Sequence, residues 1–281
     1  MVDAVSSVAL YEVRRSVARR KVIVLVAFTI LIDTLPYVAL ASTGSSIIPV
    51  ADYPYLWVAG VFAPQSLFIP FISILIAGGT MSEEYEQGTA ELFLSKPITR
   101  LQYYAGKFLG GYAFLVFIVV LNDVLATLTA SATFGPQAGV TALPEILVVQ
   151  FYSSVLFYTV AFTVGELLRR SSLAYIFSSA MFFTSTILGV YLALILGITD
   201  NRLYAAILRL LPTTATSSLP SLLAGRLLPS AASFILGLVS AFPSSGGGFD
   251  FYLELIAVYT ATALAAGVIH FVVADVTKRS G

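Results

Sequence analysis

The densest group of ionisable side chains lies in the stretch MSEEYEQGTAELFLSKPITR, residues 81–100, which holds four of the chain's fifteen acidic residues. We expect Ser82 to cap a helix, because serine hydroxyls accept hydrogen bonds from the free amides of a first turn. Glu83 and Glu84 would follow in that turn, where the positive end of the helix dipole favours carboxylates. The first half of the stretch therefore predicts a short helix with an acidic front.

The second half of the stretch contains a break and two further capping signals. Gly88 permits a sharp turn, and Thr89 can cap a second short helix that carries a Leu-Phe-Leu run. Pro97 ends this helix, and Thr99 with Gln102 forms a capping-box pattern for the next one. Two short amphipathic helices held between longer apolar segments are suited to docking on another surface. The plainer interpretation is that the glutamates are solvated and that Gly88 only makes a turn.

The composition of the chain indicates a membrane protein. Of its 281 residues, 58% are hydrophobic and 11% are charged, and the mean hydropathy is +0.92. Soluble domains carry about one quarter charged residues. The formal net charge is zero, so bulk charge indicates no nucleic-acid partner. The lack of cysteine excludes disulfides, thiolate metal sites and cysteine nucleophiles.

Six apolar stretches reach the length of about 20 residues that a helix needs to cross the hydrocarbon layer. Backbone groups in lipid must be satisfied within their own segment, so helices are expected. We therefore predict an all-α integral membrane protein whose residues 1–281 form a single transmembrane domain. The predicted spans are residues 22–40, 58–80, 102–130, 144–168, 173–198 and 251–274. In the long outer connection, 199–250, we expect the segment PSAASFILGLVSAF, residues 229–242, to be a re-entrant or surface-lying helix rather than a seventh span.

The distribution of Lys and Arg predicts the orientation of the chain. Twelve of the fifteen basic residues fall on one side of a six-span topology, so both termini and the stretch 81–100 should be cytoplasmic. Those twelve are Arg14, Arg15, Arg19, Arg20, Lys21, Lys96, Arg100, Lys107, Arg169, Arg170, Lys278 and Arg279.

The N-terminal segment 5–20 is predicted to be an interfacial helix that lies in the headgroup plane of the lipid bilayer. Leu10 and Val17 share its apolar face. Glu12 and Arg15 lie on the opposite, polar face. The alternative is that the basic residues of this segment only set the topology.

Four polar residues lie within or near the apolar segments, where an acidic side chain costs roughly 2.5–3.5 kcal/mol at a helix centre. They are Asp33, Asn122, Asp123 and Glu254. In a dimer they would be doubled and could line an acidic translocation path, although local hydrogen bonding at the headgroup boundary is the plainer interpretation. Glu166 has Arg169 and Arg170 at i+3 and i+4, which predicts an interfacial ion pair.

The sequence lacks the motifs of an enzyme. It has no G-x-x-x-x-G-K-[ST] phosphate loop, because its only Gly-Lys pair, Gly106 and Lys107, continues into Phe108. It also lacks H-E-x-x-H and G-x-S-x-G, and we interpret its single histidine, His270, as an interfacial side chain. No catalytic residue, metal site or cofactor site is predicted in this chain.

The segment EEYEQGTAELFLSKPITRLQYYAGKFL, residues 83–109, resembles the intracellular signature of ABC-2-type transporter permeases. The residues that carry the resemblance are Glu86, the Gly88–Thr89 pair, the apolar run 92–94, Pro97 and Lys107. The resemblance extends over most of the chain, through the N-terminal helix, the six spans and the long outer connection.

This resemblance implies the permease subunit of an ATP-driven exporter in the cell membrane, paired with a second permease chain as a homodimer or related heterodimer. ATP and Mg²⁺ would belong to a separate ATP-binding subunit. Residues 82–95 would be the coupling helix that fits a groove on that subunit. The residues implied in this contact are Glu83, Glu84, Glu86, Gly88, Thr89, Glu91 and Leu92.

Two other classes of function stay open from the sequence. An ion-coupled secondary transporter could use Asp33 and Asp123 as ion sites, although the prolines of span 58–80 have no clear counterpart in a second half of the chain. A non-transporting membrane scaffold is the other class, because the chain must obtain any energy from elsewhere.

Overall fold

The computed structural model describes residues 2–18, 20–43, 48–89, 98–199, 201–230, 232, 235–237 and 246–273. The regular elements in this part of the chain are all helices, and six of them are long and apolar enough to cross a membrane. These six are α2 (Arg20–Thr43), α3 (Trp57–Ala77), α6 (Arg100–Phe134), α7 (Leu143–Leu168), α8 (Ser171–Leu196) and α12 (Phe249–Val273). The prediction of an all-α membrane protein with six transmembrane helices is confirmed.

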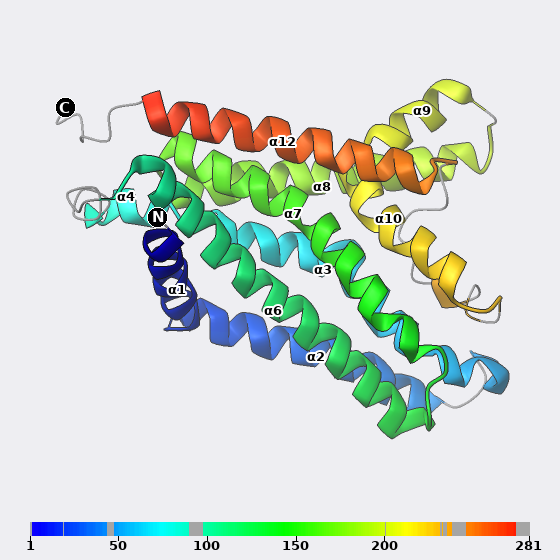
Figure 1. Ribbon diagram of the computed structural model, residues 1–281. Coiled ribbons are helices and arrows are strands. Elements are labelled where there is room, and N and C mark those ends of the chain that lie inside the picture. Colours follow the sequence, from blue (N-terminus) through cyan, green and yellow to red (C-terminus); the bar gives the residue numbers. More distant parts are fainter. Residues whose placement is uncertain are drawn as a thin grey trace.

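The shorter elements connect or flank these six helices. They are α1 (Val2–Ala18), the 3-10 turns η1 (Val50–Tyr55) and η2 (Val140–Ala142), α4 (Ser82–Glu86), α9 (Arg202–Leu210) and α10 (Pro212–Leu227). Figure 1 shows the long helices in one bundle, with α1, α4 and the last turn of α12 at the same end. We call this end of the molecule the α4 end.

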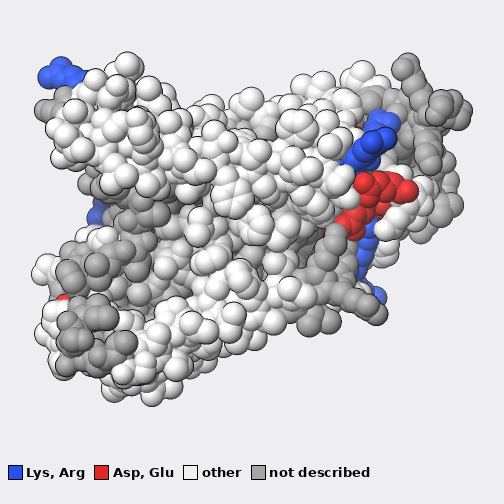
Figure 2. Space-filling view, turned by 180° about the vertical axis from the view of Figure 1, so that it is seen from behind, with Lys and Arg blue, Asp and Glu red and all other residues white. Residues whose placement is uncertain are grey.

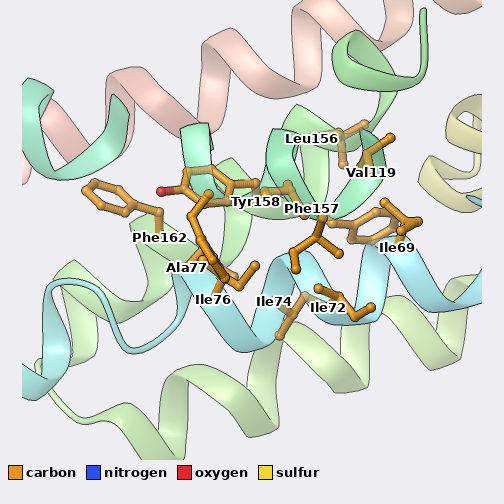
Figure 3. Close-up of a cluster of buried hydrophobic side chains, with 14 of the residues drawn as sticks. Ile69, Ile72, Ile74, Ile76, Ala77, Val119, Leu156, Phe157, Tyr158 and Phe162 are labelled. Atoms are coloured by element: carbon orange, nitrogen blue, oxygen red, sulfur yellow. The ribbon is translucent and has the colours of Figure 1, made fainter. Parts of the chain in front are cut away.

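The core of the bundle forms where α3 packs on α7. Ile72, Ile74 and Ile76 of α3 belong to the same buried cluster as Phe157 and Tyr158 of α7, which Figure 3 shows. All five side chains are buried. These apolar side chains are shielded from both lipid and water because they pack closely. This close packing fixes α3 and α7 relative to each other. The two helices therefore give the α4 end a rigid base.

The helix α1 packs on α6 at an unusually close distance. A Cβ atom built on Gly110 would lie 2.5 Å from the carbonyl oxygen of Ala9, and one on Gly106 would lie 2.6 Å from the Cβ of Val8. Two glycines four residues apart let helix backbones approach closely in a membrane. The sequence GKFLG at 106–110 thus explains why α1 folds back onto α6 and crosses the end of the bundle (Figure 1).

The start of α6 confirms a prediction from the sequence. The Thr99 hydroxyl accepts a hydrogen bond from the Gln102 amide at 3.2 Å, and the Gln102 side chain accepts one from the Thr99 amide at 2.9 Å. This is the reciprocal capping box that TRLQ predicts. It fixes the point at which α6 begins, at Arg100.

The connection 199–250 contains a helix that is packed inside the bundle. Most of α10 is buried, including its hydroxyl-rich first half, and it lies against α7, α8, α12 and α3. Thr213 and Ser185 of α8 share a hydrogen bond of 2.7 Å. The segment PSAASFILGLVSAF, residues 229–242, lies largely outside the described residues.

Candidate functional site

The helix α4 continues almost directly from α3. The N-cap position is Met81, in a helical conformation with φ −94° and ψ −45°, and it makes no side-chain cap. The Ser82 hydroxyl donates instead to the Gly78 carbonyl at 2.5 Å. The prediction that Ser82 caps the helix is therefore wrong. The reason is that the preceding backbone is already helical, whereas a capping residue needs an extended conformation.

Glu84 lies at the centre of a buried ionic cluster. Its side chain is 1% exposed, and it contacts Arg15 of α1 at 2.9 Å and both Lys107 and Tyr103 of α6. Lys107 also contacts Glu12 of α1 at 2.6 Å. Each of these charged groups has a partner of opposite charge. Such pairing is what allows charged groups to be buried, because an unpaired charge there is costly.

Glu83 and Glu86 tie α4 to α8. Tyr175 of α8 donates a hydrogen bond to Glu83 at 3.2 Å, and Arg15 lies 3.6 Å from the other oxygen of Glu83. Glu86 accepts from both the amide and the hydroxyl of Ser171, at 2.8 and 2.9 Å. Ser171 is the first residue of α8, so the Glu86 carboxylate caps that helix from another element.

Tyr85 ties α4 to the C-terminal end of α7. Its hydroxyl donates to Glu166 at 2.6 Å, and His270 of α12 lies 3.4 Å from the other Glu166 oxygen. The predicted ion pair of Glu166 with Arg169 or Arg170 is wrong in the described part of the chain. Arg169 ends α7 in a left-handed conformation, with φ 51°, and its guanidinium group lies over the Tyr85 ring. Arg169 therefore lies near enough to act electrostatically on Glu166, but it packs on Tyr85 and, among the described residues, forms no ion pair with Glu166.

These contacts join α4 directly to α1, α6, α7 and α8, and to α12 through Glu166. We call this group of side chains the α4 junction. It comprises Glu12, Arg15, Glu83, Glu84, Tyr85, Glu86, Tyr103, Lys107, Glu166, Ser171, Tyr175 and His270. Figure 2 shows acidic side chains bordered by Lys and Arg at one end of the molecule, and the long face between the two ends shows none among the described residues. A displacement of α4 must therefore move several helices together.

Fewer residues of the segment 82–89 are exposed than the resemblance implies for contact with a partner. Glu86, Gln87 and Gly88 are exposed, whereas Glu84 is buried and Glu83 and Thr89 are partly covered. Gly88 has φ +68°, and nothing lies within 4 Å of the position of a Cβ atom there. Glu91 and Leu92, which the resemblance implies in partner contact, lie outside the described residues.

The comparison with protein families agrees with this architecture. The model of the family described as ABC-2 family transporter protein matches residues 6–276. The chain belongs to the ABC-2 transporter family. No individual curated protein matches it. An ABC-2 chain is the membrane-spanning part of an ABC transporter, and the ATP-binding part is generally a partner.

The candidate path residues of this ABC-2 chain fall in different surroundings. Asn122 and Asp123 are buried side by side on α6, and Asn122 donates to Asp123 at 3.1 Å. Glu254 is exposed on α12. Asp33 belongs to α2, and its side chain lies outside what the structure describes. Of the four residues, the structure brings together only Asn122 and Asp123 within the described part of the chain.

Sequence reasoning missed the α1 side of the junction. Glu12 was expected on a polar face opposite the apolar one, but it is buried against Lys107, while Leu10 and Val17 are exposed. The polar face of α1 thus packs on protein and the apolar face points outward. The pattern Gly106-x-x-x-Gly110 is the signal that could have indicated a helix packed on α6.

Proposed function

We propose that this chain is the permease subunit of an ATP-driven exporter in the cell membrane, with the α4 end in the cytoplasm. Two copies, or one copy and a related chain, would enclose the path, and separate ATP-binding subunits would bind the exposed surface at Glu86, Gln87 and Gly88 and the segment that follows. The observation that supports this proposal is the bonding of Glu83, Glu84, Tyr85 and Glu86 to different helices.

The α4 junction would transmit the partner's motion. When the ATP-binding subunits close, they would push on the exposed surface, and the push would reach α3 directly and α1, α6 and α8 through the charged contacts. Such a push shifts the equilibrium only if the partner binds the two conformations of the permease with different affinity. The buried ionic cluster favours rigid-body motion, because separating its charges would leave them unpaired. The helices at the junction would therefore tilt as a unit.

The test uses the complex purified from native membranes and reconstituted in lipid. The chain contains no cysteine, so Glu145→Cys places a single spin label at the first turn of α7, where Glu145 is exposed. We expect ATP to change the distance between the labels of two copies. In Gly88→Val the change should be lost while ATP hydrolysis continues, because valine strains a left-handed backbone.

The control is Gly88→Asn, because asparagine tolerates the left-handed conformation. It should keep the ATP-dependent change in distance. Glu86→Ala should lose the change, as Gly88→Val does. A distance change of normal size in both Glu86→Ala and Gly88→Val would contradict the coupling role, and the absence of a label pair would contradict the pairing of two identical copies.

A further inference from the structure

A second polar cluster lies inside the bundle, where α3, α6 and α7 meet. It contains Asn122 and Asp123 of α6, Gln150 of α7 and Gln65 of α3. Each of these four side chains is at most 1% exposed. Asp123 is eleven residues before the end of α6, or about 16 Å along the helix, which places it well inside the apolar region.

The amide donors of this cluster bind backbone carbonyls of α3. Asn122 Nδ2 donates to Gly60 at 3.3 Å, and Gln150 Nε2 donates to Val61 at 3.3 Å. The Gly60 carbonyl is free to accept, because the residue four positions later is Pro64, which has no N–H. These bonds orient the two side chains.

The oxygens of the cluster lack partners. Asn122 Oδ1, Asp123 Oδ2, Gln150 Oε1 and both side-chain polar atoms of Gln65 are buried without a hydrogen bond. Gln65 lies one helical turn after Val61, on the face of α3 to which Gln150 binds. Among the residues whose side chains are described, no Lys, Arg or His forms an ion pair with Asp123. A buried carboxylate and buried amide oxygens in this state are costly and call for a ligand.

The chemistry of these atoms selects the ligand. The unpartnered atoms include one carboxylate oxygen and three amide oxygens. Oxygen ligands of this kind favour hard cations over the softer transition-metal ions. The cluster carries one negative charge, so a monovalent cation makes it neutral, whereas a divalent cation would leave a net charge in the apolar interior. Protonation of Asp123 would neutralise the charge and supply one O–H donor, but a single donor cannot serve all three amide oxygens.

We propose that Asp123, Asn122, Gln150 and Gln65 bind one small monovalent cation, with Na⁺ as the probe. The cation would link α3, α6 and α7 at the point where Pro64 interrupts the hydrogen bonds of α3. The proposal goes beyond the proposed transport function and does not rest on it. A structural ion of this kind stabilises the folded bundle by RT ln(1 + c/Kd), where c is the Na⁺ concentration and Kd is the dissociation constant of the ion from the folded chain.

The test measures thermal unfolding of the purified chain in lipid nanodiscs, in NaCl and in choline chloride of equal ionic strength. We expect Na⁺ to raise Tm by about 5 °C at concentrations well above its Kd, with a rise that follows the logarithm of the Na⁺ concentration. Asp123→Asn should abolish the difference between the two salts. Glu145→Gln, which changes an exposed acid on α7, should keep it.

A second variant and a second measurement guard against a variant that does not fold. Gln65→Leu keeps the carboxylate and removes one oxygen, so it should weaken the Na⁺-dependent rise in Tm by at least half. Radioactive ²²Na⁺ binding to the wild type should saturate near one ion per chain. Equal Tm values of the wild type in the two salts, an unchanged Na⁺ effect in Asp123→Asn, or stabilisation by acid without any effect of Na⁺ would each overturn the proposal.

Discussion

At the scale of single residues, Lys107 has the most demanding position in the chain. It is fully buried, and its ammonium group contacts Glu12 and Glu84, which come from two different helices. The cation lies 4.9 Å from the centre of the Tyr11 ring as well. A buried group with so many partners resists substitution, because each partner would lose its compensating charge.

We expect Lys107→Met to lower the free energy of unfolding by about 3–5 kcal/mol, since it removes a buried cation that contacts both Glu12 and Glu84. Denaturant unfolding in detergent micelles measures this loss. The double variant Lys107→Met/Glu84→Gln restores the net charge of the ionic cluster. It should recover at least half of the free energy of unfolding that the single variant loses. A loss below about 1 kcal/mol in the single variant would show that the pair is not buried in the protein in solution.

At the scale of elements, α1 depends on its close approach to α6. Gly110 leaves no room for a side chain, because a Cβ atom there would meet the carbonyl of Ala9 and the Cβ of Glu12 at 2.7 Å or less. The contact also brings Glu12 and Arg15 to Lys107 and Glu84. The ionic cluster and the glycine contact therefore stabilise the same helix pair.

Gly110→Val should displace α1 from α6. The readout is maleimide labelling of Ser16→Cys, because Ser16 is buried on α1 at 2% exposure. We expect slow labelling in the wild-type background and labelling at least ten times faster with Gly110→Val. Gly225→Ala is the control, since nothing lies within 4 Å of a Cβ atom at Gly225. Equal labelling rates in the two backgrounds would contradict the close packing of α1 on α6.

Sequence analysis predicted the elements of this chain well and their contacts poorly. The six spans follow from the length of apolar runs, and the capping box at Thr99 and Gln102 depends on residues three apart. The partners of Glu84 could not be predicted in this way. Lys107 is 23 residues away and Arg15 is 69 residues away along the chain, so their contacts depend on how whole helices pack.

The misread residues share that cause. Glu166 has two arginines close by in sequence, but α7 ends at Leu168, and within the described structure Arg169 packs on the Tyr85 ring without forming an ion pair with Glu166. Glu12 was assigned to a polar face by its helical period, and the period does not say whether water or protein covers that face. In both cases the tertiary packing decides which of two reasonable partners is used.

At the scale of the whole molecule, the described part of the chain divides into an apolar bundle and a charged end. The bundle places α3 and α7 in a packed core, and the α4 end collects the ionic contacts of α1, α4, α6 and α8. An ABC-2 permease without an ATP site of its own needs a surface through which a partner can move it. We propose that the exposed residues beside the α4 junction are that surface.

The most direct test places a photo-reactive amino acid at Gln87, which is exposed at the end of α4, and illuminates native membranes that contain the assembled complex. The account predicts a covalent product between this chain and an ATP-binding subunit, and none when the same group replaces Glu145 at the start of α7. A partner attached through Glu145, or no product at Gln87 in the assembled complex, would contradict the claim that the α4 junction is driven by an ATP-binding partner.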